Sequence, residues 1–281
     1  MDRWTDGPNG PPVFLNNTPR CGGTLGRSGV RRIPMAESRM SPAPEEVSTP
    51  PARRQLRTRS AGWPQAIARW LASARIRPNH ISIASLVFAA IAAWAFYRAG
   101  RYPMRSGDMF IFMGERARRW RTYSAWMLVL GAAGIQLRLL CNMLDGLLAI
   151  EGGLKTKTGE LFNEIPDRIA DAMILAGAGY ALGRVGWGPA LGWSAAVLAV
   201  LTAYIRVLGG SLGLTQDFSG PMAKQHRMFV LTMGALIAAM EIAIRGRVTA
   251  LWIALVIIVA GAAFTAALRI ARIARQLEAR S

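Results

Sequence analysis

Long apolar runs alternate with short polar segments from about residue 81 to the C-terminus. Runs of about 20 apolar residues are long enough to cross a hydrocarbon core of about 30 Å. The pattern therefore predicts an all-α integral membrane protein with about six transmembrane helices. The expected spans cover residues 81–97, 123–150, 160–182, 188–214, 228–244 and 248–270.

The segment before the first span divides into two parts. Residues 1–60 are rich in Pro, Gly, Ser and Arg without apolar periodicity, which predicts a disordered basic tail. Residues 63–76 are amphipathic, which fits a helix lying in the membrane interface or one packed against the bundle. The apolar face comprises Trp63, Ile67, Trp70, Leu71 and Ala74. We expect a membrane domain over residues 61–275 and a short C-terminal tail at 276–281.

Charge supports a membrane location. The chain of 281 residues is 52% hydrophobic and has a formal net charge of +18, with 34 Lys and Arg against 16 Asp and Glu. The basic residues flank apolar runs and no nucleic-acid-binding motif appears, so an anionic membrane surface is favoured over nucleic acid. The loop charges place the N-terminus in the cytoplasm, although six arginines between residues 101 and 121, in the connector 98–122, fall on the wrong side. The predominance of Arg over Lys suggests a GC-rich bacterial genome, hence a bacterial inner membrane.

Acidic and amide side chains concentrate between residues 142 and 171, at the ends of two apolar segments. Asn142, Asp145 and Ala149 share one helical face. A second face contains Glu160, Asn163, Asp167 and Asp171. Carboxylates are costly in a bilayer, so acids beside apolar spans are candidates for function. Gly152, Gly153 and Gly159 permit a tight reversal between the two faces, which predicts that they converge on a shared metal cluster.

This stretch resembles the signature of the CDP-alcohol phosphotransferases, D-x2-D-G-x2-A-R-x8-G-x3-D-x3-D. From Asn142 to Asp167 the chain reads N-M-L-D-G-L-L-A-I, eight residues, and G-E-L-F-N-E-I-P-D, with every spacing kept. RPNHIS resembles the opening of the family's first membrane helix, and GPMAKQHR resembles its basic loop between spans four and five. The resemblance covers about residues 63–275.

The resemblance implies two divalent ions, Mg²⁺ or Mn²⁺, bound at the first three motif positions, and a catalytic base at the fourth. Carried over by position, these are Asn142, Asp145, Asn163 and Asp167. Asn replaces Asp at the first and third positions, and Ile150 replaces the motif arginine. An Asn carbonyl supplies an oxygen ligand without the charge, so the site should be weakened. Glu160, Glu164 and Asp171 are near enough to compensate, and a shifted register pairing Asp167 with Asp171 is the alternative.

Further residues are assigned to substrates. The nucleotide would lie along Asp145, Gly146, Ala149 and Gly159, where small residues leave room near the backbone. The candidates for phosphate or acceptor binding are Lys155, Lys157, Arg206, Lys224 and Arg227. The two loop lysines would equally serve as membrane anchors. Arg206 lies within a span and needs a partner, for which Asp171 and Glu241 are the alternatives to a substrate.

These observations favour a transferase of phospholipid synthesis. It would move a phosphatidyl group from a CDP-activated lipid, with CDP-diacylglycerol as the expected donor, to a small alcohol and release CMP on the cytoplasmic side. Glycerol 3-phosphate or inositol phosphate suits the basic residues, and serine remains open. One alternative is a degenerate relative that binds the nucleotide lipid without turnover. Another is a transporter that uses the acids for coupling. The family resemblance also implies a possible homodimer.

Overall fold

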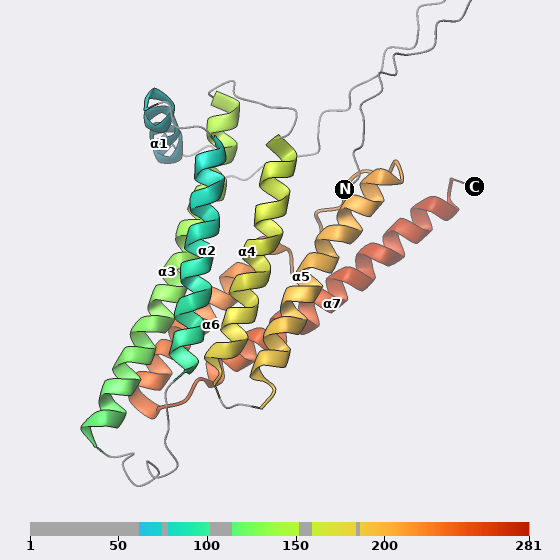
Figure 1. The fold of residues 1–281 in the computed structure, drawn as a ribbon. Helices are drawn as coiled ribbons and strands as arrows, with labels where there is room; N and C mark the ends of the chain where they lie inside the picture. Colours follow the sequence, from blue (N-terminus) through green and yellow to red (C-terminus); the bar gives the residue numbers. More distant parts are fainter. Residues whose placement is uncertain (1–61, 75–77, 102–113, 152–158, 184–185, 281) are drawn as a thin grey trace, which may run out of the picture. The chain divides into compact units, whose positions relative to one another are not determined.

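The computed structural model describes residues 62–74, 78–101, 114–151, 159–183 and 186–280. The regular elements of this part are all helices (Figure 1). They are α1 (Gly62–Ser73), α2 (Pro78–Gly100), α3 (Glu115–Glu151), α4 (Gly159–Ala181), α5 (Gly188–Ser211), α6 (Lys224–Arg245) and α7 (Thr249–Glu278). The all-α fold predicted from the apolar runs is confirmed. The basic tail expected at 1–60 lies outside the described residues.

Five of these helices are long and apolar enough to cross a membrane: α2, α3, α5, α6 and α7. The sixth expected span corresponds to α4. Its 23 residues are about 34 Å long at 1.5 Å per residue, enough to cross the bilayer. Its N-terminal half is too charged for the same classification, because it carries Glu160, Glu164, Asp167, Arg168 and Asp171. The protein is therefore a multi-pass membrane protein in which one long helix is strongly polar at one end.

The helix boundaries correct the sequence prediction at two places, the starts of α3 and α6, and agree with the helical C-terminal end expected after the last span. α3 begins at Glu115, so the end of the connector expected at 98–122 is already helical, while residues 102–113 lie outside the described part. α6 begins at Lys224, which places Lys224 and Arg227 in a first helical turn and not in the expected loop 215–227. α7 continues to Glu278, so the basic end of the chain extends the last span as one helix.

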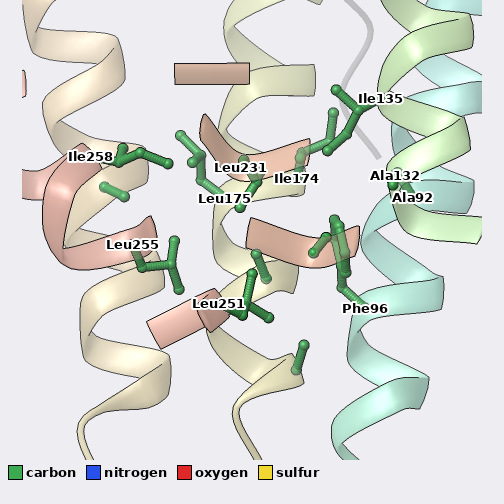
Figure 2. Packing of buried hydrophobic residues seen from close by; sticks show 14 of the residues in the cluster. Ala92, Phe96, Ala132, Ile135, Ile174, Leu175, Leu231, Leu251, Leu255 and Ile258 are labelled. Atoms are coloured by element: carbon green, nitrogen blue, oxygen red, sulfur yellow. The ribbon is translucent and has the colours of Figure 1, made fainter. Parts of the chain in front are cut away.

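Small residues bring the helices close together. α2 packs against α3 and α4, α4 against α5, α3 against α6, and α7 against α5 and α6. A Cβ added to Gly179 of α4 would lie 2.7 Å from the Cα of Gly192 in α5. A Cβ on Gly177 would lie 2.8 Å from the Cα of Ala93 in α2. Such close backbone contact is how membrane helices associate without a hydrophobic driving force. One apolar cluster fills the bundle, with Phe96 among its largest buried side chains (Figure 2).

Helix α1 packs against the bundle on one side and exposes two tryptophans. Ile67 and Leu71 pack with Leu144 and Leu148 of α3, so one side of α1 contacts the bundle. Trp63 and Trp70 were predicted on that same face but are 53% and 65% exposed. The two indoles lie seven residues apart and therefore share a helical side. Exposed Trp side chains are typical of the membrane–water interface.

Candidate active site

Polar and charged side chains from six helices meet near the beginning of α4. Hydrogen bonds and ion pairs link most of them across helices that are far apart in sequence. The participants are Ser82 and Ser85 of α2, Arg138, Asn142 and Asp145 of α3, Glu164, Asp167, Arg168 and Asp171 of α4, Thr202 and Arg206 of α5, Lys224 and Arg227 of α6, and Arg269 of α7. Asn142 and Asp167, one from each acidic face predicted from the sequence, are in contact here. The surrounding cations include Arg206, Lys224 and Arg227, which the sequence assigned to phosphate or acceptor, and Arg138 and Arg269, which it did not single out.

Arg138 lies between the two aspartates of α4. Its side chain is fully buried, and its Nη2 donates to Asp167 Oδ1 at 3.0 Å and to the Asp167 carbonyl at 3.2 Å. Its Nη1 lies 2.8 Å from Asp171 Oδ1, a close ion pair without hydrogen-bond alignment. Asp171 is itself 1% exposed. A buried carboxylate without a counter-charge is very unfavourable, and Arg138 supplies that counter-charge to both aspartates.

Lys224 and Arg227, one turn apart on α6, contact the remaining carboxylate oxygens of this pair. Lys224 Nζ forms a short ion pair with Asp167 Oδ2. Arg227 Nη2 lies 3.3 Å from Asp171 Oδ2, and its Nη1 donates to the Met222 carbonyl at 3.1 Å. All four carboxylate oxygens of the aspartate pair therefore face a protein cation.

Two serines of α2 donate hydrogen bonds to Asn142 and Asp145. Ser85 Oγ donates to Asn142 Oδ1 at 2.7 Å, and the Asn142 amide donates to Asp167 Oδ1 at 2.6 Å. Ser82 Oγ donates to Asp145 Oδ2 at 2.9 Å, and the Asp145 side chain is buried. Asn142 thus acts as a hydrogen-bond donor towards Asp167, which an aspartate at this position does not do when ionised.

Arg206 finds its partner on α4. Its Nη2 lies 2.7 Å from Glu164 Oε1, whose second oxygen pairs with Arg168. The guanidinium carbon lies 5.0 Å from the centre of the Phe218 ring. The two alternatives proposed from the sequence, Asp171 and Glu241, are therefore both wrong. Within the described residues the Nε of Arg206 is buried without a hydrogen-bond partner.

A pocket with a volume of about 300 Å³ opens beside Arg206, between α5, the segment 212–223 and α7. Two further arginines of α7, Arg269 and Arg272, line it. Arg269 donates to the carbonyls of Thr202 (2.7 Å) and Ser219 (3.1 Å), and Arg272 pairs with Asp217 at 2.9 Å. Partial burial raises the pKa of Asp217, but hydrogen bonds from Ser219 and the charge of Arg272 outweigh it and keep this pKa below its usual range.

The side chains of several predicted site residues lie outside the part of the chain that the structure describes. Lys155 and Lys157 lie outside the described residues, and the side chains of Ala149, Gly159 and Asn163 are not described although their backbone is helical. Gly146 is half-buried beside Asp145 on α3. Sequence reasoning missed Arg138, Arg269 and the two serines of α2. The rule that singled out Arg206, a charge within an apolar run, applies equally to Arg138.

The site has two ends, the Asp167–Asp171 pair on α4 and the Asn142–Asp145 pair on α3, and only one of them is suited to bind a divalent cation. Among the described residues, no three His, Cys, Asp or Glu side chains lie close enough to hold a metal ion together. The Asp167–Asp171 end does not fit one, because each of its four oxygens already faces a cationic nitrogen. The other end offers the oxygens of Asp145 and Asn142, which suit a hard cation that keeps water or phosphate oxygens as its remaining ligands.

Comparison with known proteins gives a consistent picture. No family model matches the chain. A phosphatidylinositol phosphate synthase of Mycobacteroides abscessus is 27% identical over 116 residues, which cover 38% of this chain and 49% of the relative. The match thus spans about half the length of that relative.

Crystal structures of Mycobacterium tuberculosis phosphatidylinositol phosphate synthase have a similar fold. The structure with CDP-DAG bound has a TM-score of 0.60 and 19% identity, and the match covers 76% of this chain and 94% of that protein. The structure in complex with manganese and citrate has a TM-score of 0.59 and 19% identity, covering 75% and 88%. The chain therefore has the fold of the phosphatidylinositol phosphate synthases, in agreement with the resemblance to CDP-alcohol phosphotransferases noted in the motif.

Proposed function

We propose that this protein is a CDP-alcohol phosphatidyltransferase that moves a phosphatidyl group from CDP-diacylglycerol to a phosphorylated alcohol and releases CMP. The observation that carries the proposal is the convergence of Asn142, Asp145 and Asp167 at one polar site of a bundle that shares its fold with CDP-DAG-binding synthases. The motif spacings alone leave the acceptor open, and the arginine-lined pocket beside the site favours a phosphorylated one.

The acceptor is proposed to carry a phosphate because three arginines line this pocket. Arg206, Arg269 and Arg272 face a space of about 300 Å³ directly beside the polar site. Guanidinium groups bind phosphate through charge and paired hydrogen bonds. Within the described residues the buried Nε of Arg206 has no hydrogen-bond partner. Inositol phosphate and glycerol 3-phosphate are the acceptors of this kind that we would test first.

The transfer itself needs a base for the acceptor hydroxyl. Its oxygen forms a new bond to the lipid-side phosphorus, the pyrophosphate bond to CMP breaks, and the hydroxyl proton passes to Asp167. Lys224 blocks Asp167 Oδ2 in the present arrangement. A bound phosphate would attract the flexible Lys224 ammonium and release this oxygen, so that substrate binding itself would free the base.

A divalent ion, Mg²⁺ or Mn²⁺, is proposed at the other end of the site. Asp145 and Asn142 would hold it, and when bound it would neutralise charge on the pyrophosphate. Asp145 is buried and fixed by Ser82, and Asn142 is fixed by Ser85, so both are already oriented.

We further propose a bacterial inner-membrane location with the site on the cytoplasmic side, and assembly as a homodimer.

A second candidate function has one observation in its favour. Both carboxylate oxygens of Asp167 are engaged by protein cations, as expected for a structural residue in a protein that binds the nucleotide lipid without turning it over. The two candidates differ in whether CMP appears.

The test uses the purified full chain in detergent with CDP-diacylglycerol, Mn²⁺ or Mg²⁺, and inositol phosphate, glycerol 3-phosphate or serine in turn. CMP release that depends on one acceptor and is lost in Asp167→Asn supports the transferase. Arg206→Gln should raise the KM for the acceptor at least tenfold and leave the KM for the lipid within twofold. The exposed Arg118→Gln on α3 is the matched control. Retained lipid binding without CMP from any acceptor would establish the second candidate and refute the first.

A further inference from the structure

The aspartate pair of α4 is surrounded by fixed positive charge. Asp167 and Asp171 contribute two negative charges, while Arg138, Lys224 and Arg227 contribute three positive ones within 3.3 Å. The pair and its partners therefore already carry a net charge of +1. A divalent cation added here would meet repulsion from three cations, and the buried location would reduce the screening of that repulsion.

Arg138 holds the position that a bridging cation would take. Its two terminal nitrogens divide between Asp167 Oδ1 and Asp171 Oδ1, so that one planar group joins both carboxylates. A guanidinium stays protonated at any ordinary pH and is the side chain best suited to bridge two carboxylates. Arg138 is completely buried in this position.

The amide at position 142 belongs to the same arrangement. Asn142 Nδ2 donates to the same Asp167 oxygen that Arg138 contacts, at 2.6 Å. A carboxylate at this position would place a negative charge against Asp167 and would call for a metal ion between them. Asn142 and Arg138 therefore act together, one as neutral donor and the other as resident cation.

We propose that Arg138 replaces a divalent ion at the Asp167–Asp171 end, so that these aspartates are not metal ligands and the chain binds at most one Mn²⁺, at Asp145 and Asn142. The inference deepens the proposed function and rests on it only for the ion at Asp145. Arg138 is a positioning residue in this proposal, because it orients Asp167 without touching substrate.

Mn²⁺ binding to the full chain in detergent, measured by calorimetry and by electron paramagnetic resonance, tests the proposal without requiring turnover. We expect one ion or none per wild-type chain. Asp171→Asn, which is nearly isosteric, should leave the wild-type affinity within twofold, while Asp145→Asn should remove any bound ion. Arg138→Met should raise the affinity at least tenfold or add a second ion, and Arg138→Lys should do neither.

Two wild-type ions per chain, or a loss in Asp171→Asn as large as that in Asp145→Asn, would overturn the proposal. If Arg138→Met does not fold, the comparison between Asp171→Asn and Asp145→Asn decides alone. The outcome is separate from that of the CMP assay: a chain that binds Mn²⁺ as expected but releases no CMP retains this inference and loses the proposed function.

Discussion

Replacing Arg138 by methionine should be among the most destabilising single changes in the bundle. The substitution keeps an unbranched side chain in the cavity but removes the cation that contacts Asp167 at 3.0 Å and Asp171 at 2.8 Å. Arg138 is 0% exposed and Asp171 is 1% exposed, so water cannot take over the lost contacts. Removing one partner of a buried ion pair costs about 3–5 kcal/mol.

Because other partners of the two aspartates remain in Arg138→Met, we expect its loss in the free energy of unfolding to lie in the lower part of this range. Asp167 keeps Lys224 and Asn142, and Asp171 keeps Arg227. We therefore expect the free energy of unfolding to fall by about 3 kcal/mol, a substantial fraction of the roughly 5–15 kcal/mol that stabilises a folded protein.

The same helix offers a matched control. Arg119 of α3 also pairs with a carboxylate, that of Glu115 at 3.4 Å, but the two side chains are 82% and 74% exposed. Arg119→Met makes the same chemical change in water and should alter the free energy of unfolding by less than about 0.5 kcal/mol. The comparison separates the effect of burial from the loss of an arginine as such.

Both variants would be unfolded reversibly with sodium dodecyl sulfate in mixed dodecylmaltoside micelles and followed by tryptophan fluorescence. A difference of about 2.5 kcal/mol or more between them would agree with the contacts described. If Arg138→Met costs no more than about 1 kcal/mol, the buried charge network does not stabilise the bundle as we argue.

Two further predictions concern packing and pH. Gly179→Ala should lower the free energy of unfolding by about 1–3 kcal/mol because its Cβ would meet the backbone of α5, whereas Gly186→Ala, with open space around it, should change it little. Equal melting temperatures for the two variants would contradict this. Because the pKa of Asp217 is depressed, its pairing with Arg272 should stabilise the fold above the usual Asp pKa of about 3.9 and be lost as the pH falls through the lower folded-state value. The melting-temperature difference between wild type and Asp217→Asn should therefore be constant from about pH 8 to 5 and shrink only below about pH 4; a decline starting near neutral pH would refute the assignment.

Several features of this protein were predictable because they depend on local sequence. Apolar runs about 20 residues long gave the membrane helices, since helix length and bilayer thickness must match. The spacing from Asn142 to Asp167 placed these residues on converging faces, and the structure joins them with a 2.6 Å hydrogen bond. The same spacing also gave the family resemblance, and the structural comparisons show a similar fold.

Other features depended on how the helices are rotated and packed. The contact of Arg138 with Asp167 joins residues 29 positions apart, and that of Lys224 with Asp167 joins residues 57 positions apart. Neither pairing follows from a helical period, because each requires two helices to present their charged faces to each other. The partner of Arg206 was mistaken for the same reason.

The sequence by itself determined which residues are costly to bury and therefore need partners. Only the tertiary structure decided the partners, because close packing at residues such as Gly179 and Gly177 fixes the separation and rotation of the helices. That geometry turns an acidic motif, expected from its sequence to hold two metal ions, into a site where Arg138 lies between two of the acids.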